Sequence, residues 1–285
     1  MIQNVRHVIR LRTRLRQLAL LIMQFASRLV LSSRLRREGL PLSPRSVLLL
    51  AIYRNKNALI ILPLIREAQD RGWEIRLWAL DEIHPSLAAF SVGSGTGAKF
   101  PLLNSLLGSG NWSDFEWVVV ADDDVKLERG SLRVFLHTAE EAGLSVAQPA
   151  HSPLSYRGHN INLVVPFSVA HLTTFVENGP IFAVHRSWFD RFFPFPDGYA
   201  MGWGLELLWM DLIKTGARLG IVDLVTMRHV NPIAGQYAAL PELERVQELL
   251  RARGAKSIHE LEHTLGVWRP WQRRPDWLST SGPVG

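Results

Sequence analysis

Apolar and polar positions in the first half of the chain form two patterns, short continuous apolar runs and longer amphipathic stretches. Short apolar runs predict strands buried on both faces, whereas apolar residues at helical spacing predict helices. We expect strands at residues 47–53, 74–80 and 115–121, and helices at 55–71 and 100–107. Because strands that alternate with helices form parallel sheets, the predicted fold class is α/β, with helices on the faces of the sheet.

The second half continues with shorter elements. A helix at 131–142 and an apolar helix after Gly202 are expected, together with strands at 144–150, at 180–185 and at 219–229, which ends at His229. Residues 151–176 show no clear pattern. The C-terminal part predicts two helices, at 241–253 and 257–265, and a partly disordered tail over 268–285, in which Trp268, Trp271 and Trp277 are expected to pack on the body.

The first 40 residues differ from the remainder in charge. They hold nine arginines and one acid, Glu38, so they contribute +8 to the net charge of +6 and leave the remainder at −2. Leu11, Leu15, Leu18, Ile22, Phe25 and Leu29 recur at helical spacing, which predicts a basic amphipathic helix. Such a helix can lie on an anionic membrane surface, or it can pack on the body or against a second copy.

This arm does not resemble a membrane span or a nucleic-acid module. Its longest run without a charge, 17–27, has 11 residues, whereas a spanning helix needs about 20. No aromatic residue or motif favours nucleic-acid binding. The absence of cysteine excludes disulfides and thiolate chemistry. We expect a cytoplasmic protein, peripheral on the inner face of the membrane, divided into an arm (1–42), a catalytic domain (43–236) and a C-terminal helical segment (237–285).

Three consecutive carboxylates, Asp122, Asp123 and Asp124, follow the strand at 115–121. Ligands of open α/β sheets bind beyond the carboxyl ends of the strands. In an extended chain, residues two apart point to the same side, so Asp122 and Asp124 can share one partner while Asp123 faces the other way. Two carboxylates on an open edge suit Mg²⁺ or Mn²⁺ with phosphate oxygens as further ligands. The alternative is a solvated turn or a helix cap.

Two later stretches could complete such a site. His229, at a predicted strand end, could be a further metal ligand, although a histidine there is also common as a structural residue. In the stretch GWGLE, Gly202 and Gly204 allow the backbone to approach a ligand, and Trp203 offers a flat face to a sugar ring. Glu206 could accept a proton from a hydroxyl group. The alternative is a charge at a helix N-terminus beside a core tryptophan.

In this order the motifs resemble GT-A-fold glycosyltransferases, above all the family-2-type enzymes and a group of uncharacterised glycosyltransferase-like proteins with SxAQPA, FVE and WGL[DE] segments. Here those segments are residues 145–150, 175–177 and 203–206, and residues 227–229 (MRH) resemble the metal-histidine strand of galactosyltransferases. The resemblance spans about residues 45–236. It implies a GT-A-like, mostly parallel sheet, a nucleotide-sugar donor and Mn²⁺ or Mg²⁺.

The resemblance also implies roles for single residues. Asp124 and His229 would hold the metal, and Asp122 would contact the metal or the ribose of the nucleotide. Glu206 would be the general base of an inverting transfer, and Glu177 would hold the acceptor or the donor sugar. Further residues expected around the bound donor are Tyr53, Arg54, Asp81, Lys99, Asn104, Asp123 and Trp203.

One departure bears on the base. Galactosyltransferases follow the glutamate with aspartates, one of which is their base, whereas Leu207 and Leu208 follow Glu206 here. The base role therefore falls to Glu206; if another group holds it, Glu177 is the base or the transfer is retaining.

The predicted function is a metal-dependent glycosyltransferase of the hexosyltransferase type, with a UDP-sugar donor and a glycan or glycolipid acceptor in polysaccharide biosynthesis. A nucleotidyltransferase is one alternative, but residues 51–60 (AIYRNKNALI) lack the glycine-rich phosphate loop that it would show. A non-catalytic, sugar-binding relative is the other, and the intact carboxylates argue against it.

Overall fold

The computed structural model describes residues 47–232 and 240–279, together with positions 19, 22, 23, 25–27, 29–32 and 35. Its centre is a ten-stranded sheet in the order β10-β7-β9-β6-β8-β4-β1-β2-β3, with β5 paired to β9 beside this path. The strands are β1 (Val47–Tyr53), β2 (Glu74–Ala79), β3 (Ser91–Ser94), β4 (Trp117–Asp122), β5 (Val125–Arg129), β6 (Val146–His151), β7 (Ala170–Thr173), β8 (Ile181–His185), β9 (Leu219–His229) and β10 (Thr264–Trp268).

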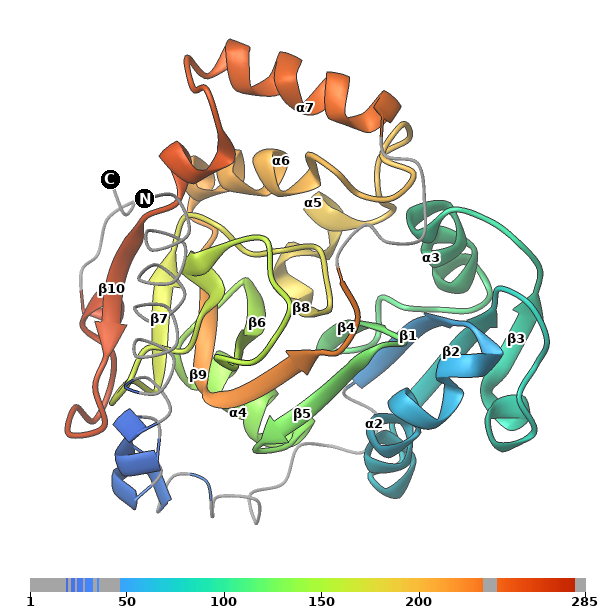
Figure 1. The fold of residues 1–285 in the computed structure, drawn as a ribbon, viewed down its shortest axis with the longest axis horizontal. Coiled ribbons are helices and arrows are strands. Elements are labelled where there is room, and N and C mark those ends of the chain that lie inside the picture. Colours follow the sequence, from blue (N-terminus) through green and yellow to red (C-terminus); the bar gives the residue numbers. More distant parts are fainter. Residues whose placement is uncertain are drawn as a thin grey trace, which may run out of the picture.

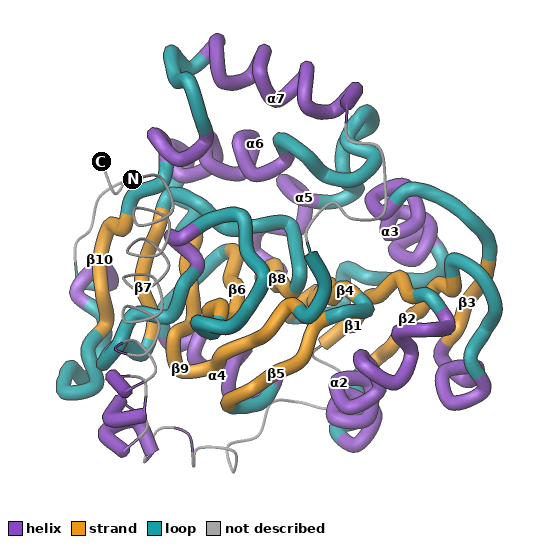
Figure 2. Tube along the Cα trace, in the orientation of Figure 1, coloured by secondary structure: helices purple, strands orange, loops and turns teal. Residues whose placement is uncertain are grey.

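Besides the helical positions of the N-terminal arm, six helices surround the sheet in the described residues (Figure 1, Figure 2). They are α2 (Ala58–Asp70), α3 (Lys99–Gly108), α4 (Leu132–Glu141), α5 (Phe189–Phe192), α6 (Leu205–Leu212) and α7 (Leu240–Ala252). The predicted α/β class with helices flanking a central sheet is thus confirmed. Among the residues described, no helix is both long and apolar enough to cross a membrane.

The strands β3, β2, β1 and β4 are parallel neighbours, as their alternation with helices predicts. Beyond β4 the sheet is mixed, because β8 runs antiparallel to both β4 and β6, while β9 is parallel to β6. The register pairs Ile52 with Asp122, so β1 and β4 end at the same edge. This edge is where the aspartates stand.

The alternation of side chains along β1 decides which helices cover which face. Leu49 and Ala51 join the core beneath α2 and α4, whereas Leu48 and Leu50 join the core beneath α3, α5 and α6. Burying both faces explains why β1 is an unbroken apolar run. A third, smaller cluster joins α6 to α7 through Leu207, Val246 and Leu250, and Figure 1 shows these two helices stacked at the top of the view.

Three parts of the structure differ from the prediction. Residues 91–94, which lie outside the predicted strands and helices, form β3 at the edge of the sheet, and the unpredicted strand β5 follows the aspartates after a tight turn. The helix expected at 257–265 is wrong. Only a 3-10 turn, η7 (Ile258–Leu261), forms, and the next residues become β10, which pairs antiparallel with β7. The sheet edge offered by β7 outweighs the weak local helical pattern.

The C-terminal tail contacts the body through two of its tryptophans, as far as residue 279, where the description ends. Trp268 and Trp277 are buried, and the indole N–H of Trp277 donates to the carbonyl of Ala142 at 2.9 Å. Trp271 is instead 74% exposed. Two of the three predicted aromatic contacts with the body are therefore present.

The described positions of the N-terminal arm are helical and contact the body through one side. Leu31 is buried in the main core, and the backbone N–H of Phe167 donates to Ser27 Oγ at 3.1 Å. The predicted apolar stripe lies elsewhere, because Ile22, Phe25 and Leu29 are 62%, 66% and 69% exposed. The residues that pack on the body are thus not those of the stripe. Leu11, Leu15 and Leu18, and the domain boundaries at 42 and 236, lie outside the described residues.

Candidate functional site

A cavity of about 740 Å³ opens at the sheet edge where β4 ends. The wall beside the sheet is polar and includes the three aspartates and the end of β9. The opposite wall is formed by the GWGLE turn, α7 and η7, and it contains the apolar side chains of Trp203, Leu243, Val246, Leu250 and Ile258. The cavity therefore has a charged wall beside the sheet and an opposite wall that mixes apolar side chains with polar ones.

The charged wall contains a cluster of Asp122, Asp124 and His229, whose ligand atoms all lie within 4.8 Å of one another. His229 Nε2 lies 2.8 Å from Asp124 Oδ1. Pairing of β5 with β9, in the register Val125 with His229, brings these residues together across 105 positions of sequence. Two carboxylates and an imidazole are a donor set that fits Mn²⁺ or Mg²⁺ with open positions for water or phosphate.

The electrostatics of this pair favour the ionised carboxylate. Burial alone would raise the pKa of Asp124, but the hydrogen bonds from His229 and Asn231 and the charges of His229 and Lys99 together hold that pKa below its usual value. The pKa of His229 is likewise raised by Asp124 against the effect of burial. Ionised carboxylate is the form that binds a cation.

Asp122 and Asp123 point to different partners, as their alternation predicts. Asp122 Oδ1 lies 2.6 Å from Lys99 Nζ, and this lysine also donates to the carbonyl of Asn178 at 2.9 Å. Asp123 Oδ2 accepts the backbone N–H of Arg54 at 2.7 Å, and burial raises the pKa of Asp123 to about 6. All three aspartates, Lys99 and Arg54 line the cavity.

Glu206 lies half-buried in the cavity wall, in the first turn of α6. Burial raises the pKa of its carboxyl to about 7. Asn178 Nδ2 donates to Oε1 at 2.6 Å, and the backbone N–H of Gly204 donates to Oε2 at 3.2 Å. A carboxylate whose pKa lies near neutral pH can accept and release a proton under physiological conditions.

Glu177 also lines the cavity, but its surroundings lower the pKa of its carboxyl group. Its Oε2 lies 3.0 Å from His151 Nε2, while His151 Nδ1 lies 2.6 Å from Ser155 Oγ. Although burial would raise the pKa of Glu177, the hydrogen bond and charge of His151 keep it below its usual value. Ser155 Oγ also accepts the backbone N–H of His229 at 2.8 Å. A hydrogen-bonded chain thus connects Glu177 to the metal-ligand candidate.

The GWGLE stretch forms a turn before a helix, as expected, but its glycines serve contacts within the protein. Gly202 and Gly204 adopt φ of +94° and +92°, and a Cβ at Gly202 would lie 2.2 Å from Phe100. Glycine is therefore required for the turn itself. The backbone N–H groups of Met201 and Trp203 donate to Glu242 of α7, at 2.7 and 3.0 Å, so α7 fixes the turn that carries Glu206.

Three residues expected near the nucleotide do not line this cavity. Tyr53 is fully buried, and its hydroxyl lies 2.9 Å from Ser91 Oγ. Asp81 Oδ1 accepts the backbone N–H of Asn55 at 2.8 Å. Asn104 exchanges two hydrogen bonds with the backbone of Phe195. Their polar groups make hydrogen bonds to other parts of the chain instead.

The residues that line the cavity but were not predicted include His151, His159, Asn178 and His259. Three residues that hydrogen-bond to the cavity wall were also not predicted, namely Ser155, Glu242 and Glu262. Five of these seven lie in 151–176, whose elements were not assigned, or in 257–265, which was assigned wrongly. The one signal available was the density of histidine and polar residues between 151 and 178.

No family model and no curated protein sequence matches the chain. Among solved structures, it is similar to S. aureus TarS 1–349 in complex with UDP-GlcNAc, with 12% identity and a TM-score of 0.48 over 75% of this chain and 68% of that one. It is also similar to GalNAc-T7 with UDP, GalNAc and Mn²⁺, with 10% identity and a TM-score of 0.49 over 72% of this chain. The chain covers 48%, about half, of GalNAc-T7. What the cavity can do depends on its own side chains.

Proposed function

We propose that this protein is a metal-dependent glycosyltransferase that moves a hexose from a nucleotide sugar to a hydroxyl group of a glycan or glycolipid. The observation that carries the proposal is that one cavity holds both a carboxylate–imidazole cluster suited to a divalent cation and a separate glutamate with a pKa near 7. Sugar transfer from a nucleoside diphosphate needs both a positive charge at the leaving group and a proton acceptor.

Asp124 and His229 would hold Mn²⁺ or Mg²⁺, with Asp122 as the third ligand or as a contact of the ribose. When bound, the cation would neutralise charge that develops on the leaving diphosphate. Lys99, which lies 2.6 Å from Asp122, would add positive charge at the same end of the cavity. Arg54 and Asp123 would lie beside the nucleotide, and we propose a UDP-sugar as the donor.

Glu206 would accept the proton of the attacking hydroxyl. The hydroxyl oxygen forms a bond to the anomeric carbon, the bond from that carbon to the phosphate oxygen breaks, and the proton passes to Glu206. This single displacement inverts the anomeric centre. Glu177 is less suited to this task because His151 keeps its pKa low; it would hold a sugar hydroxyl instead, while Trp203 supplies an apolar face for the acceptor.

The test is ligand-dependent thermal unfolding of the wild type and Asp124→Ala with nucleoside diphosphates and nucleotide sugars, with and without Mn²⁺. A ligand at 100 times its dissociation constant adds about 2.7 kcal/mol to the free energy of unfolding. We expect stabilisation by a uridine nucleotide that needs Mn²⁺ and is absent in Asp124→Ala. Stabilisation that persists in the variant, or a folded wild type that responds to no nucleotide, would contradict the proposal.

A product assay separates the transferase from a nucleotidyltransferase. Turnover of a nucleotide sugar by a glycosyltransferase releases a nucleoside diphosphate, whereas a nucleotidyltransferase releases pyrophosphate from a nucleoside triphosphate. Glu206→Gln should abolish diphosphate release while donor binding persists. Binding without turnover for any donor and acceptor would instead favour a sugar-binding protein.

We further propose that the arm docks on an anionic bilayer, with the active site acting on acceptors at that surface. Exposed Ile22, Phe25 and Leu29 supply the apolar contact, and the arginines of residues 1–40 supply the charge. Sedimentation with phosphatidylglycerol vesicles should recover the wild type but not Phe25→Glu/Leu29→Glu. Equal recovery of both proteins would contradict this docking. So would a wild type that does not bind vesicles but forms a dimer that the variant does not form.

A further inference from the structure

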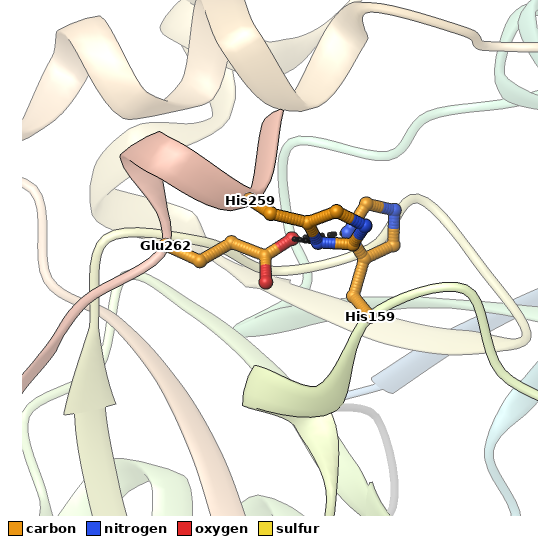
Figure 3. Close-up of side chains that lie close together, drawn as sticks. All are labelled: His159, His259 and Glu262. Atoms are coloured by element: carbon orange, nitrogen blue, oxygen red, sulfur yellow. Dashed lines mark hydrogen bonds and ion pairs between the residues drawn. The ribbon is translucent and has the colours of Figure 1, made fainter. Parts of the chain in front are cut away.

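A second cluster of metal-binding side chains stands at the rim of the cavity. His159 precedes the short turn at 160–162, whereas His259 and Glu262 belong to the region of η7, about 100 residues later. Figure 3 shows the two imidazole rings converging on one carboxylate oxygen. His259 Nδ1 lies 3.0 Å from Glu262 Oε1, and His159 Nδ1 is hydrogen-bonded to the same atom.

We propose that His159, His259 and Glu262 form a second cation site, which binds Zn²⁺ or a similar transition-metal ion. The three ligand atoms lie within 4.8 Å of one another. Two imidazoles and one carboxylate are a ligand set used for zinc, with a fourth position left open. This set differs from the aspartate-rich cluster at the other end, because imidazole nitrogen selects transition metals over Mg²⁺.

The surroundings of the cluster indicate that the site is preorganised in the absence of an ion. The His159 ring packs on buried Phe175 with ring centroids 4.3 Å apart, which fixes one ligand. The Glu262 side chain is 8% exposed, whereas that of His259 is 61% exposed. Two ligands are thus held by packing, and the third stands on the solvent side, where an ion can enter.

The position of the site indicates what a bound ion would do. His159 and His259 both line the cavity, so the open coordination position lies at its rim. The ion would join the loop after β6 to the segment between α7 and β10, two parts of the wall far apart in sequence. It would thereby fix the acceptor side of the cavity and offer a coordination position to an oxygen atom of an acceptor.

The test uses the full-length chain carrying Asp124→Ala, so that the first cluster does not bind the ion. After treatment with a chelator, the protein is titrated with Zn²⁺ by calorimetry, and with Co²⁺ while the visible spectrum is recorded. We expect one equivalent of Zn²⁺, a higher unfolding temperature and a Co²⁺ absorption band. Loss of a residue that only hydrogen-bonds to a metal ligand weakens metal binding about 10–100-fold. Loss of a ligand itself, in Asp124→Ala/His259→Ala, should therefore weaken Zn²⁺ binding by more than this.

His263→Ala is the matched control, because His263 is an exposed histidine four residues from His259 and outside the cluster. It should leave Zn²⁺ affinity unchanged. No Zn²⁺ binding by Asp124→Ala, or equal loss in the two histidine variants, would overturn the proposal. If the His259→Ala variant does not fold, the same titration is made with Glu262→Gln, which should also weaken Zn²⁺ binding; an unchanged affinity would overturn the proposal. The titration needs no nucleotide sugar, so its outcome is independent of whether the protein proves to be a glycosyltransferase.

Discussion

Replacing Glu206 with glutamine should stabilise the fold at pH 8 and have little effect at pH 5. The folded protein holds the pKa of Glu206 at about 7, against 4.5 for the free group. Between these values the unfolded chain releases its proton while the folded chain keeps it, so stability falls as pH rises and the loss is complete above pH 7. At 1.36 kcal/mol for each pH unit, the full cost is at most about 3 kcal/mol.

Two effects reduce the gain from Glu206→Gln. The cavity is open to solvent, which screens part of the cost. The backbone N–H of Gly204, which donates to Oε2, would face an amide N–H₂ group in the variant, at a cost of about 1 kcal/mol. The donor from Asn178 keeps its partner in Oε1. We therefore expect a net gain of about 1–2 kcal/mol at pH 8 and about zero at pH 5.

Urea unfolding at the two pH values measures this difference. Glu244→Gln, on the exposed side of α7, is the control and should change stability by less than about 0.5 kcal/mol at both. If Glu206→Gln is destabilising at pH 8, or acts equally at pH 5 and 8, the carboxyl is not held in its neutral form by burial and its assignment as the base loses its physical support.

Three further predictions test other parts of the molecule. Turnover should fall about tenfold for each pH unit below an apparent pKa near 7, because Glu206 must be ionised to accept a proton; a flat pH–rate profile between 5 and 7 would contradict this. Arg76→Ala should destabilise the fold by about 3 kcal/mol in urea unfolding, because buried Arg76 donates to four carbonyls at the end of α3, whereas exposed Arg66→Ala should change little. Ser155→Ala should weaken Mn²⁺ binding about tenfold in calorimetry, because Ser155 holds the backbone of His229, and an unchanged affinity would contradict this.

The parts of the fold that could be predicted are those set by local pattern. β1 is a continuous apolar run, β4 is one up to its last residue, Asp122, and β2 is apolar except for Glu74 and Arg76, so their sequences alone identify them. β5 could not be identified in this way, because its residues, VKLER, alternate between apolar and charged over one short stretch, and its strand structure comes from pairing with β9. β10 was mistaken for a helix for the same reason, since its partner β7 lies about 90 residues earlier.

The site shows the same limit. The aspartates and the GWGLE turn are contiguous motifs, so their residue types at that spacing indicated a ligand site before any geometry was known. The contact of His229 with Asp124 depends on the register between β5 and β9, and the sequence suggested it through a family resemblance rather than through spacing. His159 and Glu262 meet across 103 positions without any motif, which is why the second cluster emerged from the structure.

Five carboxylates line the cavity, and the partners of four of them separate their roles. Asp122 is paired with Lys99, Asp124 with His229, and Glu177 with His151, so each has a basic group within 3.0 Å. The hydrogen bonds to Glu206 come instead from an amide and a backbone N–H. A basic partner favours the ionised carboxylate, whereas a buried carboxyl bonded to neutral donors keeps its proton to higher pH. When the surroundings give neighbouring acids different pKa values, the group that titrates near neutral pH is the one able to exchange a proton during a reaction. Asp123 is also bonded to a neutral donor, the backbone N–H of Arg54, and burial raises its pKa to about 6. Among the other four carboxylates, the distribution of partners supports the proposal that Glu206 takes the proton and that Asp122 and Asp124 bind the cation.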